Sequence, residues 1–326
     1  MKRGLSASLP RLGWQLAAFA LAGAALFLLF RATSISLSEK GVATGFGFLE
    51  QIARVPVANA SIPFESGVDT YGRALLVGAA NTFKISLAAI LLATVIGIPI
   101  GAGGLSANPL VRSLCAAYVD LMRNVPVLLH ITIWYMVFLV LPGPRQAIQL
   151  GDWLLLSNRG LFLPGWLWVD GGLVFQLPRA EGFDIISAFS ISPEYGALLI
   201  GIGTYTAAFV AEIFRGAVLA VPAGQWEAGQ AIGLSSGKVF RKIIFPQASR
   251  VAIPPLTSEY LGTFKNSSLA VAIGYQDIVG VGNSILFETG QAIEVISLVL
   301  TFYIVSSLLV SLLMEALNRR LALKER

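Results

Sequence analysis

Charged residues are scarce in this chain. Only 13% of its 326 residues are charged and 56% are hydrophobic, whereas soluble domains carry about 25% charged residues. So little charge cannot cover the surface of a soluble protein of this length, and we expect lipid to solvate most of it. The chain also has one cysteine, Cys115, and one histidine, His130. These counts exclude an internal disulfide and argue against a zinc site of His and Cys ligands.

A nucleotide-binding loop is lacking as well. Residues 233–238 read GLSSGK, with the glycines and the lysine of a Walker A loop. That loop needs four residues between its glycines and Ser or Thr after its lysine. Here three residues separate Gly233 from Gly237, and Val239 follows Lys238. No arrangement of a nucleophile with a base stands out elsewhere, so the sequence predicts no enzyme and no metal site in this chain.

Long apolar runs are abundant. A helix that crosses about 30 Å of hydrocarbon needs roughly 20 mostly apolar residues. The first run follows basic residues, as in a signal peptide, but no convincing cleavage site follows it, so we predict an uncleaved anchor. Pro254 and Pro255 are expected to break the fifth run. The sequence therefore predicts an all-α membrane protein with about six transmembrane helices, at residues 13–30, 75–105, 125–141, 195–220, from about 250 onward, and 295–317.

The positions of the charges predict the orientation of these helices. Lys and Arg concentrate in cytoplasmic segments close to the spans, and six crossings place both termini on one side. With the termini in the cytoplasm, the outer segments 31–74 and 143–193 are rich in acidic residues, and the net charge of +5 reflects topology rather than nucleic-acid binding. The inner segments then hold Lys2, Arg3, Arg11, Arg112, Arg123, Arg215, Lys238, Arg241, Lys242, Arg250, Arg319, Arg320, Lys324 and Arg326.

Residues 143–193 are apolar but do not fit a membrane-spanning helix. Pro164, Pro178 and several glycines interrupt the run, and they disfavour a continuous helix. Tryptophan is enriched at membrane–water interfaces, and this segment holds Trp153, Trp166 and Trp168. We therefore expect an outer loop that lies at the interface, with its tryptophans near the headgroups.

A charged segment that contains glycines, residues 222–246, separates two apolar runs. Pro222 suits the first turn of a helix, and Gly233 is placed to end that helix in a left-handed conformation. Ser235 or Ser236 can cap a second short helix, which Pro246 stops. The pattern leaves two readings open, a hairpin that docks into another protein and an amphipathic pair on the bilayer surface. Its apolar side chains have no span to bury them: Trp226, Ile232, Leu234, Phe240 and Ile244.

This hairpin resembles the EAA loop of the membrane subunits of ATP-binding-cassette (ABC) importers. The family pattern is E-A-A, three residues, G, nine residues, I-x-L-P. Two positions depart from it, since Gly229 replaces alanine and Phe245 replaces leucine. Gly229 is expected to loosen its helix by about 1 kcal/mol relative to alanine. The resemblance implies that the matching residues couple the chain to an ATPase subunit: Glu227, Ala228, Gly229, Gly233, Ile243 and Pro246.

The resemblance extends over nearly the whole chain beyond the first run. The stretches NTFKISLAAILLATVIGIPIGAGGLSANPLVRSL, YTAAFVAEIFRGAVLAVPAGQWEAGQAIGLS and FKNSSLAVAIGYQDIVGV are similar to the polar amino-acid branch of these permeases. Within that branch, LLSNRGLFLP and SPEYGALLIG most resemble general L-amino-acid permease subunits. Asp120 and His130 depart from the branch, where Glu and Gln are expected.

The resemblance implies a type I ABC importer permease fold in the bacterial inner membrane, with both termini in the cytoplasm. It divides the chain into an anchor with an outer segment (1–74), a permease domain (75–317) and a basic tail (318–326). The permease domain contains the outer loop 143–193 and a cytoplasmic coupling loop, 221–246. The implied partners are two copies of an ATP-binding subunit, a second permease subunit and an extracytoplasmic amino-acid-binding protein. ATP and Mg would bind to the ATPase partner, and this chain would bind no cofactor.

Glu212 is the sharpest candidate for the transport path, because a charged side chain within a span usually faces a cavity or a partner. It lies three residues before Arg215, so the alternative is a structural ion pair. Polar residues that follow the fifth run are candidates for a gate, since irregular polar backbone at membrane depth lines protein or water. Asp277 belongs to that region or is solvated. The other path or gate candidates are Asn124, Lys265, Asn266, Ser267 and Ser268.

Two features of the spans indicate packing rather than a site. His130 is a lone histidine in an apolar run and is expected to be buried with one hydrogen bond. Gly97 and Gly101 form a Gly-x-x-x-Gly pair, which allows a second helix to approach closely and is weak evidence for an oligomer contact.

Three other functions fit the composition. An ion-gradient-driven secondary transporter would use Glu212 as its coupling carboxylate, but no convincing inverted repeat is present. A membrane anchor would have no path and would tolerate changes at Glu212 and Asn266. An ABC permease for another polar solute would share the hairpin, and the sequence does not reveal which amino acids pass.

Overall fold

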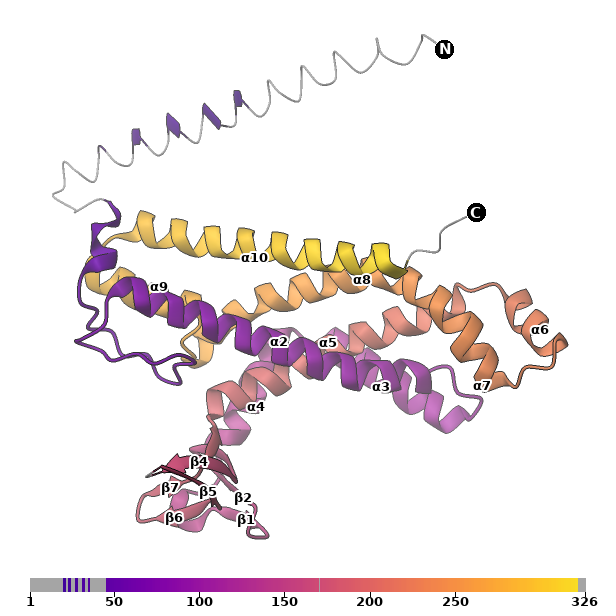
Figure 1. The fold of residues 1–326 in the computed structure, drawn as a ribbon, viewed down its shortest axis with the longest axis horizontal. Coiled ribbons are helices and arrows are strands. Elements are labelled where there is room, and N and C mark those ends of the chain that lie inside the picture. The colour runs from indigo at the N-terminus through magenta and orange to yellow at the C-terminus, as the bar shows by residue number, and fades with distance from the viewer. Residues whose placement is uncertain are drawn as a thin grey trace.

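The long helices form one elongated bundle. The computed structural model describes residues 45–169 and 171–321, with a few positions between 20 and 35. Figure 1 shows α2 (Tyr71–Gly103), α5 (Pro193–Leu219), α8 (Phe245–Asn266) and α10 (Ala292–Leu321) running roughly lengthwise. The helical bundle expected from the apolar runs is confirmed. The expected span at 13–30 lies largely outside the described residues, as do the last five residues of the basic tail.

The described residues supply three to five candidate spans. Three helices are long and apolar enough to cross a membrane: α2, α5 and the part of α10 at Ala292–Ala316. Two bent pairs raise this number to up to five. α3 (Pro109–Asn124) meets α4 (Val127–Leu139) at 100°, and the segment Ser236–Ile273 meets α9 (Ile278–Thr289) at 49°. With 13 residues, α4 is about 20 Å long, so the expected third span does not cross by itself.

The contact between α2 and α5 depends on small residues. A Cβ on Gly97 would lie 2.6 Å from the carbonyl oxygen of Ala207, and one on Gly101 would collide with the carbonyl oxygen of Ala211. Ala93, in the same part of α2, is fully buried. The Gly-x-x-x-Gly pair therefore brings two helices of this chain together, as its spacing predicts, and this contact accounts for it without an oligomer.

The prediction that Pro254 and Pro255 break the fifth apolar run is wrong. α8 runs through both prolines, and both are exposed, so their rings displace no neighbouring helix. Transmembrane helices tolerate proline where local adjustments satisfy the freed carbonyl groups. The chain departs from α-helix later, in the 3-10 helix η4 (Ser267–Ile273), which ends at Gly274 with a φ of +79°.

Residues 148–191 fold into strands, so the all-α expectation is wrong for this segment. β1 (Ile148–Leu150), β2 (Leu154–Ser157), β3 (Gly160–Leu163) and β8 (Phe189–Ile191) form an antiparallel sheet in that order. Two separate hairpins complete the unit, β4 (Gly165–Val169) with β5 (Gly172–Gln176) and β6 (Arg179–Glu181) with β7 (Asp184–Ile186). We call residues 148–191 the β-subdomain.

The β-subdomain projects sideways from the bundle at the junction of α4 and α5 (Figure 1). Its own core is small and centres on Leu155, Phe162 and Ile185. Strands of three to five residues are too short to show a clear alternation of apolar and polar residues. The interrupting glycines are turn residues here, since Gly171 and Gly182 have φ values of +81° and +63°.

The core of the bundle is divided into clusters along its length. At one end, Phe48 and Val55, which precede α2, pack with Ile278 and Ile285 of α9. In the middle, buried side chains of α2, α4, α5 and η4 meet: Ile85, Ile131, Leu198, Ile202 and Ile273. At the other end, the close of α5 packs against the start of α8 and the segment before it.

Candidate functional site

The 222–246 hairpin caps one end of the bundle, opposite the end where α2 begins (Figure 1). Its first helix is α6 (Ala223–Ala231). Gly233 N donates to Gln230 O at 2.9 Å and Leu234 N to Gly229 O at 3.2 Å, the paired bonds that close a helix at a left-handed residue. Gly233 has a φ of +82°, so its expected role is confirmed.

Pro246 does not stop the second helix. α7 (Ser236–Val239) continues through a π-helical turn, η3 (Phe240–Ile244), into α8. A proline ring clashes with the carbonyl group four residues earlier and has no N–H. The π turn changes that spacing, since Phe245 N donates to the carbonyl oxygen of Phe240, five residues back. Pro246 therefore lies in the first turn of α8, where no N–H is needed.

One face of the hairpin packs onto the bundle. Val239 and Ile244 are fully buried against Val218 and Val221, at the end of α5. Trp226 stacks on Phe240, with ring centroids 6.3 Å apart. The apolar residues that lacked a partner in the sequence are thus mostly covered within the chain; Ile232 remains 74% exposed.

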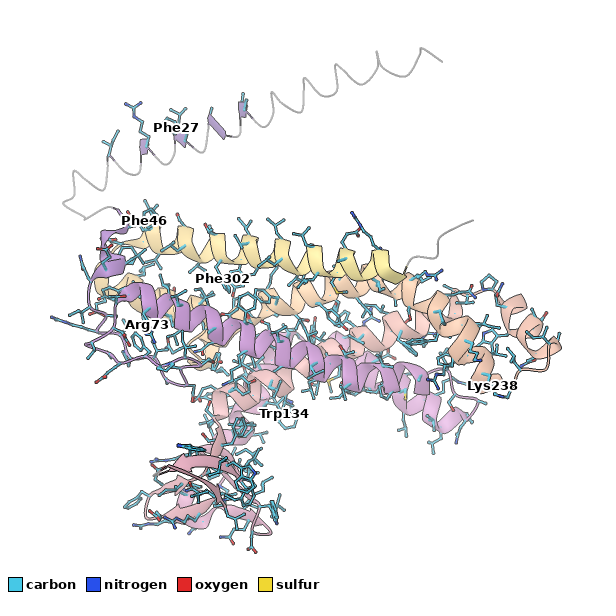
Figure 2. The ribbon with its side chains drawn as sticks, viewed as in Figure 1. Phe27, Phe46, Arg73, Trp134, Lys238 and Phe302 are labelled. Carbon is cyan, nitrogen blue, oxygen red and sulfur yellow. The ribbon has the colours of Figure 1, made fainter. Side chains whose placement is uncertain are left out.

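The matched residues divide between two faces. Glu227, Ala228, Gly233 and Pro246 are exposed, and Ile243 is half-buried. Exposed basic side chains follow on the second arm: Lys238, which Figure 2 labels at this end of the molecule, with Arg241 and Lys242. Within the part of the chain that the structure describes, Glu227 and these three basic residues form no ion pair.

Gly229 is the buried member of the motif. A Cβ on this residue would lie 2.8 Å and 2.9 Å from the two Cγ atoms of Val239 and 3.0 Å from Cδ1 of Ile243. These distances are shorter than ordinary van der Waals contact. The glycine that departs from the family pattern therefore lets the two arms of this hairpin pack closely.

A cavity of about 320 Å³ lies between α2, α3 and α5. Its uncharged lining includes Ile100, Ala116 and Val119, with Gly101 and Gly104. Five charged side chains line it, and we call it the charged cavity: Arg112, Asp120 and Arg123 from α3, and Glu212 and Arg215 from α5.

Glu212 and Arg215 form a bidentate pair in the charged cavity. Arg215 Nε donates to Glu212 Oε2 at 2.9 Å, and Arg215 Nη2 donates to Oε1 at 2.6 Å. Both side chains are 37% exposed. The structure confirms the ion pair that the three-residue spacing predicts. It neutralises itself and leaves Arg112, Asp120 and Arg123 as the cavity's other charges.

Arg123 lies with its guanidinium 5.0 Å from the centroid of the Phe209 ring. Asn124 is exposed and donates from Nδ2 to the backbone oxygen of Asp120 at 2.7 Å. A cavity with guanidinium groups and a carboxylate can bind both ends of a zwitterion. Sequence reasoning treated Arg112 and Arg123 as topology signals, and only the position of α3 beside α5 brings them to Glu212.

The other expected path residues are not part of the charged cavity. Lys265 is exposed at the end of α8, and Asn266 is half-buried. Ser267 is fully buried and donates to Phe264 O at 2.7 Å, whereas Ser268 donates to Lys265 O at 2.8 Å. These residues occupy the change from α8 to η4, and the structure does not bring them together with Glu212.

Asp277 is fully buried rather than solvated. Its Oδ1 accepts from Val279 N at 3.1 Å and Gly280 N at 2.8 Å, which caps α9. Asn81 and Thr82 of α2 hold the same segment, since Asn81 Nδ2 donates to Gln276 O at 2.7 Å and Ile278 N to Thr82 Oγ1 at 3.0 Å.

His130 is buried, as expected, and its Nε2 forms a hydrogen bond of 3.2 Å with Met122 O. It packs against Tyr205, with ring centroids 5.7 Å apart. Among the described residues, no group of three His, Cys, Asp or Glu side chains is placed to hold a metal ion.

Comparisons with known proteins agree with these features. The family described as "Binding-protein-dependent transport system inner membrane component" matches residues 75–323. YhdX of Escherichia coli (strain K12) is 38% identical, over 91% of this chain and 90% of YhdX. The general L-amino acid transport system permease protein AapQ of Rhizobium johnstonii (strain DSM 114642 / LMG 32736 / 3841) is 37% identical, over 90% of this chain and 88% of AapQ.

Among solved structures, an amino acid ABC transporter with histidines superposes with a TM-score of 0.56 at 21% identity. The match covers 77% of this chain and 95% of that one, and it supports the type I importer permease fold. The family match spans more than half of the sequence, so the predicted family is confirmed. The chain belongs to the family of inner-membrane components of binding-protein-dependent transport systems.

Proposed function

We infer that this chain is the permease subunit of an ABC importer that moves L-amino acids into the cell. The observation that carries this inference is the 222–246 hairpin, whose exposed face bears Glu227 and three basic side chains that form no ion pair among the described residues. A face of this kind suits a groove in another protein. AapQ is a general L-amino acid permease by name, and that supports the class of substrate.

The exposed face of the hairpin seats in the ATPase subunit, and each of two permease subunits contacts one ATPase copy. ATP and Mg bind to the ATPase, so this chain supplies motion and a path rather than chemistry. Glu227 and Ala228 meet the partner directly. Gly229, Gly233 and Ile243 keep the two arms packed, and Pro246 starts the helix that carries movement into the membrane.

The charged cavity contributes to the path for the amino acid. Arg123 or Arg112 binds the α-carboxylate, and Asp120 receives the α-ammonium group, since opposite charges in a partly buried site attract each end of a zwitterion. Glu212 holds the Arg215 side chain in place, while the substrate binds directly to the charges of α3. The segment from Lys265 to Ser268 acts separately, as a gate where α8 becomes η4.

The hairpin end faces the cytoplasm, and the β-subdomain faces outward. Exposed Lys238, Arg241 and Lys242 lie at the hairpin end, and basic residues near spans favour the cytoplasmic side. Both termini are then cytoplasmic, and an extracytoplasmic binding protein delivers the amino acid to the opposite face.

The test is ATP-dependent uptake of labelled amino acids into vesicles that hold the assembled complex. We expect Glu227→Ala to assemble and bind substrate but to lose most of its uptake, because the docking face loses its only acidic group. Gln230→Ala, on the same helix and also exposed, is the matched control and should transport normally. Uptake that needs no ATPase and follows an ion gradient would overturn the proposal in favour of a secondary transporter. Uptake of another polar solute alone would correct only the substrate class.

A further inference from the structure

The β-subdomain carries an aromatic face with no partner in the described structure. In the β4–β5 hairpin, Trp166 lies opposite Phe175 and Trp168 opposite Leu173, and directly opposed residues share one face of a sheet. These side chains are 66%, 40%, 71% and 60% exposed, respectively. Trp153 joins them, 61% exposed, with its ring centroid 5.8 Å from that of Phe175. We call these five residues the aromatic face.

The three arginines of the β-subdomain region are all engaged within it. Arg159 pairs with Asp184 at 3.4 Å and Arg179 with Glu181 at 2.7 Å. The third arginine of residues 143–193, Arg145, stacks on the Phe183 ring at 3.7 Å. The segment contains no lysine. Asp152, beside Trp153, is exposed and forms no ion pair among the described residues. The aromatic face itself carries no charge, so apolar contact is the main force that holds whatever covers it.

The composition of the aromatic face favours a cover that stays in place. Interfaces that form and separate are about as polar as the rest of a protein surface and carry hydrogen bonds. The aromatic face consists of Trp, Phe and Leu only, so repeated release into water would expose a large apolar patch. A binding protein that docks and leaves in every transport cycle fits this surface poorly.

The position of the β-subdomain indicates what covers the aromatic face. It projects sideways beside the helices instead of extending beyond their ends (Figure 1). The last turn of α4 leads into it with exposed apolar side chains, including Val137 and Val140, the latter 82% exposed. The apolar surface of the membrane-crossing bundle is thus continuous with the approach to the aromatic face.

We propose that the aromatic face rests in the headgroup region of the bilayer beside the bundle and anchors the β-subdomain to the membrane. Tryptophan prefers this region because its ring is apolar while its N–H can bond to water or headgroups. The leaflet is the outer one if the proposed orientation holds, whereas the contact with lipid does not depend on that orientation or on the substrate.

The test places a nitroxide label on the aromatic face of the assembled complex in phosphatidylcholine nanodiscs. Trp166→Cys and Trp168→Cys are made separately in a Cys115→Ser background. Val174→Cys is the matched control, because Val174 lies on the opposite face of the same hairpin and is 50% exposed. The measurement compares collisions with oxygen, which concentrates in lipid, and with a nickel chelate, which stays in water.

At residues 166 and 168 we expect the nitroxide to collide several-fold more often with oxygen than with the nickel chelate. At residue 174 we expect the reverse ratio, and raising the salt concentration should change neither ratio much. Nickel dominance at all three positions would show a face in water and overturn the proposal. Exclusion of both reagents from 166 and 168 would show a protein cover, such as the second permease subunit. Exclusion that appears only when the binding protein is added would identify a receptor-docking surface instead.

Discussion

At the scale of single residues, Gly229 shows how packing can reverse a propensity argument. Alanine favours a helix over glycine by about 1 kcal/mol, which predicts a loosened hairpin. In the structure the missing Cβ is what allows α6 to approach Val239 and Ile243. Overpacking a tight contact costs about 1–3 kcal/mol, so the packing effect exceeds the propensity effect.

We therefore expect Gly229→Ala to lower the melting temperature of the purified permease despite its better helix propensity. The measurement is thermal unfolding of the variant beside Gly229→Ala/Val239→Ala, in which the obstructing methyl groups are gone. The melting temperature of the double variant should fall by less than the sum of the decreases caused by Gly229→Ala and Val239→Ala separately. A single variant as stable as wild type would mean that the two arms repack freely.

Glu212 illustrates a residue whose partner the sequence predicts but whose surroundings it does not. The three-residue spacing on a helix is sufficient to predict the pair with Arg215, and the pair is bidentate. The neighbours Arg112, Asp120 and Arg123 come from α3, about 90 to 100 residues earlier in the chain. No local pattern connects residues at that separation.

At the scale of elements, α2 and α5 depend on glycine for their closest approach. A Cβ on Gly97 would lie 2.6 Å from Ala207 O and 2.7 Å from Val210 Cβ. The obstacles are backbone and a β-branched side chain, which cannot move aside as a flexible chain end can. Any side chain at this position must separate the two helices.

Gly97→Ala is expected to destabilise the bundle by about 1–3 kcal/mol through overpacking. Gly216→Ala, in α5, is the matched control because, apart from the adjoining backbone of α5 itself, no atom would lie within 4 Å of the added Cβ. It should be neutral or gain up to about 1 kcal/mol from helix propensity. Denaturant or thermal unfolding in detergent compares the two, and equal effects would contradict a steric origin.

The helix breaks show where element-level rules succeed and fail. The left-handed glycine at 233 ends a helix as its sequence context predicts, because the signal is local. Pro246, Pro254 and Pro255 do not end helices, because a π turn precedes the first and the other two lie on an exposed surface. α3 was missed although Asn108 and Pro109 supply a cap and a first-turn proline, since its apolar residues do not form a long run.

At the scale of the whole molecule, the bundle separates two unlike ends. One end carries the 222–246 hairpin with its basic surface. The other carries the segment before α2 and the first turn of α2, including Arg73, which Figure 2 labels there. Arg73 is paired with Asp69 at 3.3 Å, so this end offers less free positive charge and suits the outer side.

The orientation predicts which surfaces an impermeant reagent can reach. Lys238→Cys on the hairpin and Asp152→Cys on the β-subdomain are both exposed positions, and each is made in a Cys115→Ser background. In intact cells a charged maleimide should label residue 152 and spare residue 238, and inside-out vesicles should give the reverse. The same pattern in both preparations, or the opposite one, would contradict the proposed topology.

Local features of the sequence are sufficient to predict a helical membrane protein of the ABC permease family, with a hairpin between two apolar runs. Composition, run length and the EAA motif are local properties, so they can be read without a fold. The folded chain alone reveals the charged cavity, the packing role of Gly229, the burial of Asp277 and the β-subdomain. These features depend on groups that are not neighbours in the sequence or on strands of three to five residues. Neither kind of feature leaves a periodic pattern in the sequence.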